Sequence, residues 1–232
     1  MNPIIESLLS LLYPRVCPAC GELMVEGERL MCLKCRLSLP LTGFERSPQW
    51  NPMMEKLMCR VPVERCSAYF HYRRESPQAR LIHRFKYGGQ PSLGRELMKE
   101  YALALKPLGF FDGIDAVSPV SLSFVRLVLR GYNQSYRLAC GVSDVTGLPI
   151  VRTLRAAHHR SQTRLGADAR ARNSGRGVYR ALRDNLDGID HLLLIDDIVT
   201  TGATLRACVE ALHLERPEMR ISVLALASTR LD

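Results

Sequence analysis

The strongest constraint on the fold is a pair of apolar runs near the C-terminus. Residues 191–195 and 221–227 are almost continuously apolar, and a segment with helical spacing, 202–214, lies between them. Strands of this kind are covered on both faces, which is typical of a parallel sheet with helices on either side. The sequence therefore predicts an α/β fold with a doubly wound, mainly parallel sheet and binding sites at the carboxyl ends of its strands.

The preceding part of the chain continues the alternation of strands and helices. Strands are predicted at residues 66–72, 114–120 and 149–154, and helices at 78–85, 92–105 and 132–146. Residues 36–64 contain four of the 13 prolines and the only tryptophan, so they are predicted to be an irregular linker or a wrap over the core. With 232 residues, the chain has room for one large domain and a small appendage.

Four cysteines near the N-terminus form two matching C-x2-C pairs: Cys17, Cys20, Cys32 and Cys35. Two thiolates three positions apart can approach one ion from a single tight turn, and two such turns complete a tetrahedral site. A redox pair or buried thiols would not require two matching pairs, so we expect one structural zinc ion. The remaining cysteines are predicted to be core thiols: Cys59, Cys66, Cys140 and Cys208.

The first thirteen residues are apolar with helical spacing and precede Pro14. They have no basic start, contain Glu6 and are too short to cross a membrane, so neither a signal peptide nor a transmembrane helix is expected. A short amphipathic helix docked on its own domain is favoured over a membrane anchor. We therefore expect no membrane insertion and a cytoplasmic location, where structural disulfides are rare. The expected division is an N-terminal helix and cysteine module (1–40), a linker (41–64) and the α/β domain (65–232).

The segment LLLIDDIVTTGAT, residues 192–204, carries the most specific chemical signal. An apolar strand ends in Asp196 and Asp197, and a turn then opens a helix. The turn consists of Thr200, Thr201, Gly202, Ala203 and Thr204. Its N–H groups, hydroxyls and positive helix end suit a phosphate dianion, and the two carboxylates can accept hydrogen bonds from sugar hydroxyls. An Asp-Asp pair alone is more often a metal or capping site, but this combination predicts a ribose 5-phosphate site.

The net charge of +9 comes almost entirely from one part of the chain. Residues 152–183 contain nine arginines and one acidic residue, whereas residues 184–232 contain nine acidic and four basic residues. An isolated basic stretch beside an acidic one indicates an anion-binding loop, although a solvated face or a nucleic-acid patch would look similar. Single-stranded DNA binding usually adds stacking aromatics, and only Tyr179 is close. An anionic substrate is therefore favoured, and a nucleic-acid contact comes second.

Residues 192–204 match the phosphoribosyl pyrophosphate (PRPP) motif of type I phosphoribosyltransferases. Further motifs are Phe85-Lys86-Tyr87-Gly88-Gly89, Arg130-Gly131-Tyr132-Asn133-Gln134-Ser135, and Gln162-Thr163 followed by Arg170 and Asn173. Together with the cysteine module, they resemble the ComF family of competence-associated proteins over nearly the whole chain. The resemblance implies a small N-terminal zinc ribbon fused to a type I phosphoribosyltransferase-like domain.

The resemblance also implies a role for each motif. Residues 200–204 would hold the 5-phosphate of PRPP, and Asp196 and Asp197 would bind the ribose hydroxyls and act as the catalytic residues. The loop after residue 120 would meet the pyrophosphate, with Mg²⁺ bridging it to the sugar. Lys86, Arg126 and Arg130 would add positive charge to the PRPP site. Residues 157–177 occupy the place of the mobile loop that closes over PRPP in type I transferases.

The chain departs from the family pattern at two places. Relatives usually carry a Pro-Val-Pro-Leu-His-like stretch followed by several basic residues, where residues 119–129 keep Arg126 as their one positive charge and Arg130 follows. Fewer cations there would offset less of the charge on departing pyrophosphate while leaving 5-phosphate binding intact. Many relatives also carry a second cysteine quartet, whereas Cys59 and Cys66 form no pairs, so one zinc ion is expected.

Two functions are compatible with these features. The first is a phosphoribosyltransferase of nucleotide metabolism that transfers phosphoribose from PRPP to an unidentified nitrogen nucleophile and releases pyrophosphate. The second is a non-catalytic PRPP- or nucleotide-binding adaptor whose zinc ribbon docks a partner that takes up DNA or handles single-stranded DNA. The intact phosphate turn supports both functions, and the depleted pyrophosphate loop slightly favours the second.

Overall fold

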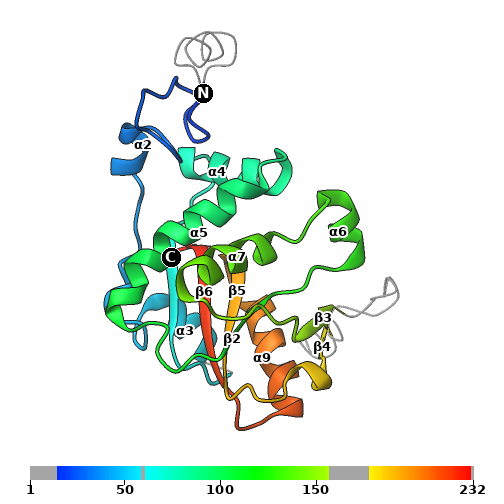
Figure 1. Ribbon diagram of the computed structural model, residues 1–232. Helices are drawn as coiled ribbons and strands as arrows, with labels where there is room; N and C mark the ends of the chain where they lie inside the picture. The colour runs from blue at the N-terminus through cyan, green and yellow to red at the C-terminus, as the bar shows by residue number, and fades with distance from the viewer. Residues whose placement is uncertain (1–14, 59–60, 157–177, 231–232) are drawn as a thin grey trace.

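The computed structural model describes residues 15–58, 61–156 and 178–230. At its centre lies a four-stranded sheet in the order β1-β6-β5-β2 (Figure 1). Its strands are β1 (Cys66–His71), β2 (Ala116–Pro119), β5 (His191–Val199) and β6 (Arg220–Ser228). All three neighbouring pairs run parallel. The predicted α/β fold class with a parallel sheet is therefore confirmed.

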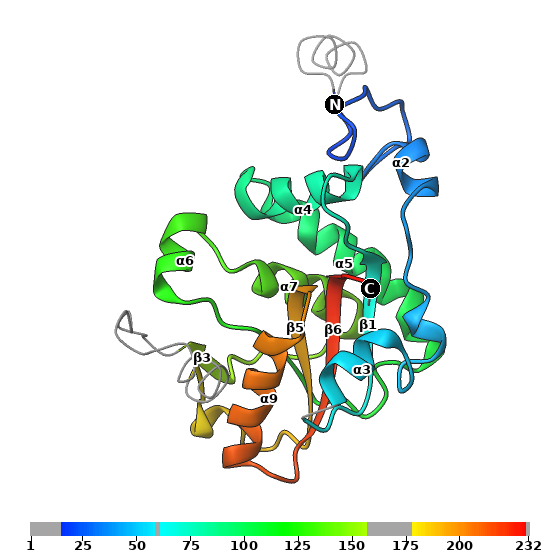
Figure 2. The same cartoon turned by 180° about the vertical axis from the view of Figure 1, so that it is seen from behind.

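Successive residues of the central strands enter two separate apolar clusters, one on each face of the sheet. Leu193 and Ile195 of β5 belong to one cluster, and Leu192 and Leu194 belong to the other. Figure 1 shows helices α5 (Pro91–Leu105) and α7 (Gln134–Thr146) over the first face. Figure 2 shows α3 (Pro52–Met58) and α9 (Ala203–Glu215) over the second. Burial of both faces explains why these strands read as unbroken apolar runs.

Helix α4 (Pro77–Tyr87) packs closely against α5. A Cβ atom on Gly94 of α5 would lie 2.1 Å from Cε2 of Phe85, so only glycine permits this approach. Phe85 itself is fully buried. This contact fixes the last turn of α4 above the carboxyl ends of the strands.

The segment after α7 differs from its predicted strand. Ile150 makes one parallel bridge to Val117 of β2. The chain then enters β3 (Leu154–Ala156), which pairs antiparallel with β4 (Tyr179–Ala181) in a second sheet. The carbonyl of Leu154 accepts a hydrogen bond from the buried Ser121 hydroxyl (2.5 Å), so this segment pairs with the loop after β2 rather than extending the central sheet.

The proline-rich segment is more regular than predicted. It contains a 3-10 turn, η1 (Phe44–Arg46), and the helix α3. Asn51 begins α3, because its side-chain oxygen accepts from the N–H groups of Met53 and Met54 at 3.1 Å each. Met53, Met54 and Leu57 are buried against the sheet. The segment therefore wraps over the core, which was one of the two predictions, and it contains regular helical turns.

Two further short helices were not predicted from the sequence. They are α2 (Leu33–Leu37), which follows the third clustered cysteine, and α6 (Phe124–Arg130), which follows β2. The cysteine-rich segment containing α2 shares an apolar cluster with α4 and α5. Arg36 also makes a bidentate ion pair with Glu100 of α5, with N–O distances of 3.1 and 2.9 Å. These contacts attach the N-terminal segment to the α/β core, while its division into separate units stays a prediction.

Two predicted elements lie outside the described residues: the N-terminal helix at 1–13 and the loop at 157–177. Across residues 15–58, 61–156 and 178–230, none of the helices combines the length and apolar character that a membrane span requires.

Candidate functional site

The two predicted carboxylates lie where β5 outruns its neighbour β2. Pro119, the last residue of β2, pairs with Ile195, whereas β5 continues beside β6 as far as Val199. Asp196 and Asp197 therefore lie in the part of β5 that extends beyond the end of β2, at the carboxyl end of the sheet. This is where ligands bind in open α/β sheets.

Asp196 is held by hydrogen bonds from neighbouring groups. Its Oδ1 accepts from the N–H of Asp197 at 2.8 Å and from the hydroxyl of Ser135 at 3.4 Å. Burial and the adjacent Asp197 carboxylate together raise the pKa of Asp196, because both disfavour its ionised form. A ligand that donates hydrogen bonds to this carboxylate would stabilise its ionised form.

Lys86 forms an ion pair with Asp197. Its Nζ lies 2.7 Å from Asp197 Oδ2, and the two side chains are only 14% and 13% exposed. Lys86 stands in the last turn of α4, one residue after the buried Phe85. The sequence predicted Lys86 to be a phosphate contact in the PRPP site. The structure places Lys86 beside the predicted site residue Asp197 and pairs it with that carboxylate.

The motif at residues 85–89 packs against the motif at residues 130–135, beside the Lys86–Asp197 ion pair. The guanidinium of Arg130 lies 5.4 Å from the ring centroid of Tyr87 and donates to its hydroxyl at 3.3 Å. The ring of Tyr132 meets that of Phe85 edge-on, with centroids 6.1 Å apart. The motif at residues 130–135 contacts α4 through Arg130 and Tyr132. It also contacts β5, because the Ser135 hydroxyl donates to Asp196. These contacts explain why segments distant in the chain belong to one site.

The predicted phosphate turn connects β5 to α9. Gly202 has φ of +73°, and a Cβ atom there would lie 3.0 Å from Leu57 Cδ2, so glycine is required. At the start of α9, the Arg206 N–H donates a helical hydrogen bond to the Gly202 carbonyl at 2.9 Å. The N–H groups of Thr204 and Leu205 precede it and are not used inside the helix. Thr200, Thr201, Ala203 and Thr204 are exposed.

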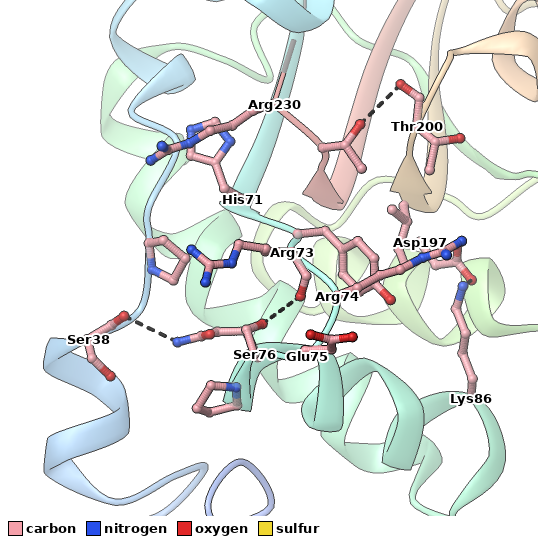
Figure 3. Close-up of a pocket in the computed structure, with 16 residues that line it drawn as sticks. Ser38, His71, Arg73, Arg74, Glu75, Ser76, Lys86, Asp197, Thr200 and Arg230 are labelled. Carbon is pink, nitrogen blue, oxygen red and sulfur yellow. Dashed lines mark hydrogen bonds and ion pairs between the residues drawn. The ribbon is translucent and has the colours of Figure 1, made fainter. Parts of the chain in front are cut away.

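A cavity of about 900 Å³ opens beside these groups (Figure 3). Asp197, Lys86 and Thr200 line one part of it. Four charged residues and one histidine that the sequence analysis did not single out also line it: Arg73, Arg74, Glu75, Arg230 and His71. The available signal was the pair of adjacent arginines just after a predicted strand, which parallel topology brings to the same sheet edge.

Three buried side-chain atoms have no hydrogen-bond partner within the described part of the chain: His71 Nδ1, Tyr132 Oη and Gln134 Nε2. His71 lines the cavity, Tyr132 packs on Phe85, and Gln134 accepts from Arg130 through its oxygen at 3.0 Å. A buried polar atom without a partner costs roughly 1–3 kcal/mol. Their position around the end of β5 fits a site whose ligand completes the hydrogen bonding.

Arg126 does not join this group. It is exposed on α6, and it is absent from the lining of the cavity. The apolar side chains around it are exposed too: Val125 and Val128 by 64% each, and Leu129 by 78%. Ser121, in the loop after β2, uses its hydroxyl to hold β3. The predicted pyrophosphate side therefore offers few free polar groups.

The four paired cysteines converge on one point. Their Sγ atoms all lie within 4.8 Å of one another, and Cys20 and Cys32 are 3.7 Å apart. Four sulfurs around a tetrahedral zinc with Zn–S bonds of about 2.3 Å would be about 3.8 Å apart. The N–H of Cys32 also donates to Cys17 Sγ at 3.3 Å, which stabilises a thiolate. The four thiols therefore lie close enough together to hold one metal ion, as the spacing predicted.

The remaining described cysteines are separate from this cluster. Cys66 is buried in β1 and contacts Asn51 Oδ1 at 3.4 Å, and burial raises its pKa to about 12. Cys208 is buried within α9, where burial raises its pKa as well. These two are core thiols as expected, and Cys140 is partly buried in α7. Cys59 lies outside the described residues.

No family model matches the chain. Among curated proteins, it is similar to competence protein F of Haemophilus influenzae, with 31% identity over 134 residues. The match covers 56% of this chain and 58% of that protein, so it spans less than two thirds of the relative. This similarity confirms the resemblance to the ComF family on which the motif assignment rests.

Two solved structures are similar over 62% of the chain, each at 19% identity. One is an allosteric regulatory enzyme of purine biosynthesis, with a TM-score of 0.43. The other is a glutamine PRPP amidotransferase from B. subtilis complexed with ADP and GMP, with a TM-score of 0.41. In both cases the match covers 30% of the other chain.

Proposed function

We propose that the protein binds PRPP at the carboxyl end of β5 and transfers its phosphoribosyl group to a nitrogen nucleophile. The observation that carries this proposal is that the Lys86–Asp197 ion pair and Thr200, the first residue of the turn before α9, line one cavity, with Asp196 next to Asp197 on β5. The turn offers N–H groups to a phosphate, and the two carboxylates can accept hydrogen bonds from ribose hydroxyls. The cavity beside them offers space for a second reactant. The similarity to competence protein F adds support.

PRPP would bind with its 5-phosphate at the start of α9. The unused N–H groups there and the positive end of a 13-residue helix favour an anion. Asp196 and Asp197 would accept hydrogen bonds from the ribose hydroxyls. Because Lys86 already neutralises Asp197, it would either keep that carboxylate in place or move to a phosphate oxygen.

Magnesium would enter with PRPP. Carboxylate oxygens are ligands that Mg²⁺ prefers, and Asp196 and Asp197 present them at the sheet edge. When bound, the ion offsets negative charge on pyrophosphate. No third acidic or histidine ligand clusters with this pair among the described residues, which fits an ion held mainly by PRPP oxygens.

In the proposed reaction, the nitrogen lone pair of the acceptor forms a bond to C1 of the ribose. The bond from C1 to the pyrophosphate oxygen breaks, and its electron pair leaves with pyrophosphate. The acceptor then loses one proton to water. Asp196 and Asp197 would steady the positive charge that develops on the sugar.

A second candidate function is a PRPP- or nucleotide-binding adaptor without turnover. The exposed apolar side chains of α6 support it, because they stand where related proteins carry basic residues for the leaving group. In that case the cysteine cluster would dock a DNA-uptake protein or a protein that handles single-stranded DNA. The relative's designation as a competence protein agrees with such a partner.

Thermal unfolding with increasing PRPP, with and without Mg²⁺, tests the proposed pocket. We expect PRPP to raise the melting temperature of the native protein, and the combined substitution Asp197→Asn and Thr201→Ala to abolish this shift. Asp187→Asn is the matched control, since Asp187 is exposed and lies outside the cavity. A full PRPP shift in the double variant would refute the pocket.

Pyrophosphate release from PRPP and Mg²⁺, measured with a panel of bases and amines, separates the two functions. Sustained turnover with any acceptor would remove the adaptor-only alternative. PRPP binding without release across the whole panel would favour it.

We also propose that the cysteine cluster holds one structural zinc ion. Elemental analysis of the purified protein should give about one zinc per chain, and Cys35→Ser should lower both this content and the melting temperature. Cys140→Ser is the control, because Cys140 lies outside the cluster. A zinc content of zero or two per chain would contradict this count.

A further inference from the structure

The cavity beside Asp197 has a second wall that the phosphate and the ribose do not use. The segment after β1, residues 72–76, forms this wall together with Arg230 after β6 (Figure 3). Arg73, Arg74 and Arg230 are exposed to the cavity, and no carboxylate within the described ranges lies at ion-pair distance from any of them. Lys86 and Asp197 cancel each other, so among the described residues that line the cavity Glu75 is the one acidic residue left to oppose three arginines.

The segment that carries these arginines is held in place. The Tyr72 N–H donates to the Ser228 carbonyl at 2.8 Å, which continues the pairing of β1 with β6. The Ser76 hydroxyl donates to the Arg73 carbonyl at 2.7 Å and also caps α4 by accepting from the Ala79 N–H at 3.2 Å. The backbone of Arg73 is thus fixed from both sides.

The same segment contains a backbone conformation that side chains rarely adopt. Glu75 has φ of +63°, and it is the one non-glycine residue with positive φ in the described part of the chain. Such a conformation costs on the order of 1–3 kcal/mol and occurs preferentially at ligand sites. Among the described non-glycine residues, this conformation occurs only in this wall, which supports a binding role for it.

His71 adds an unused hydrogen-bonding atom to this wall. Its ring meets Phe44 edge-on with centroids 5.6 Å apart, and its buried Nδ1 has no partner among the described residues. Burial and the nearby Arg230 lower the pKa of His71, so the imidazole is neutral at pH 7. One ring nitrogen therefore remains available to a ligand.

We propose that this part of the cavity is the acceptor subsite, and that the acceptor is anionic, with a carboxylate or phosphate group that Arg73, Arg74 and Arg230 bind. The inference rests on the proposed function, because it places the second reactant beside the PRPP pocket. Guanidinium groups pair with both kinds of anion through paired hydrogen bonds. A neutral base would leave three positive side chains without a partner.

Matched probes test the preference for an anion. The full-length protein is first saturated with ribose 5-phosphate and Mg²⁺, which fill the phosphate site without reacting. Calorimetry then compares orotate with uracil, which differ by a carboxylate, and glycerol 3-phosphate with glycerol, which differ by a phosphate. We expect the anionic member of at least one pair to bind about tenfold or more tightly than its neutral partner, and that pair identifies the anion.

Charge substitutions test the residues. Arg73→Gln combined with Arg74→Gln should weaken binding of the preferred anion about tenfold and leave the neutral probe and ribose 5-phosphate unchanged. Arg230→Gln should act in the same direction. Glu75→Gln should have the opposite effect and strengthen anion binding about two- to fivefold, because it removes the opposing charge. Arg46→Gln is the control, since Arg46 is exposed and does not line the cavity.

Three outcomes would overturn this inference. The first is equal binding of both members in both pairs. The second is unchanged anion binding in the arginine variants. The third is weaker binding of PRPP itself in those variants, which would assign the arginines to the PRPP site. If ribose 5-phosphate and PRPP fail to bind the native protein, the proposed function fails; if they bind and no anion is preferred, only the acceptor assignment fails.

Discussion

The two flanks of Asp196 and Asp197 are built very differently. On the flank formed by α4 and α9, Lys86 makes an ion pair with its side chain 14% exposed, and a glycine turn opens a full helix toward the site. On the flank formed by the loop after β2 and by α6, the Ser121 hydroxyl already donates to the Leu154 carbonyl of β3, and α6 exposes valine and leucine side chains. The first flank offers charged and polar groups, whereas the second presents mainly apolar side chains.

This difference separates binding from group transfer. The first flank faces the expected 5-phosphate and ribose, whereas the apolar flank faces the expected pyrophosphate. Binding requires only the first, but departure of pyrophosphate also requires charge stabilisation on the second. The asymmetry therefore predicts tight binding of PRPP and slow transfer of its phosphoribosyl group. The following substitutions change one flank or the carboxylates between the flanks.

Lys86→Met should have the largest effect, since it leaves the Asp197 carboxylate without its partner in a mostly buried position. We expect the free energy of unfolding to fall by about 2 kcal/mol. Combining it with Asp197→Asn should recover most of this loss, because no unpaired charge remains. Urea denaturation of the two single variants and the double variant measures the coupling, and purely additive losses would contradict a functional ion pair.

Asp196→Asn should stabilise the free protein at alkaline pH. The pKa of Asp196 is raised in the folded state, so between its ordinary value of about 3.9 and the raised value, folding takes up a proton and stability falls as pH increases. Removing the carboxyl should therefore add about 1 kcal/mol at pH 8, and the gain should vanish near pH 4. Unfolding free energies across this range measure it, with Asp187→Asn expected to show no such trend.

Val125→Arg should have the smallest effect, because it adds one cation to the apolar flank at a residue that is 64% exposed. We expect PRPP to bind about two- to fivefold more tightly at low salt, with stability changed by less than about 0.5 kcal/mol. Leu108→Arg adds the same charge at an exposed residue after α5 and should leave PRPP binding unchanged. Equal gains in both variants would indicate a general charge effect.

The sequence predicted the features that depend on local pattern. Unbroken apolar runs identified β5 and β6, because both faces of these strands are buried. The spacing of Cys17, Cys20, Cys32 and Cys35 identified their cluster, because each pair needs only one tight turn. The motif at residues 192–204 indicated that carboxylates would end a strand just before a helix, and both elements are present.

Features that depend on packing were missed. Helix α6 has only seven residues, and Arg126 and Arg130 are its only polar ones, so the segment was too short to give a clear amphipathic signal. Asn51 begins α3 in a segment whose prolines indicated irregular structure. The division of residues 149–154 between one bridge and β3 depends on the buried contact of Ser121 with Leu154, which no local pattern reveals.

The sequence by itself determined the parallel sheet, the cysteine cluster and the two carboxylates followed by the turn before α9, since each follows from residues close together in the chain. Only the tertiary structure decided that Lys86 pairs with Asp197, and that Arg73, Arg74 and Arg230 share one cavity with them. The reason is physical: parallel strands bring their carboxyl ends to one edge, and the closeness of α4 to α5 at Gly94 sets where Lys86 reaches. Charges far apart in the chain become neighbours only after that packing.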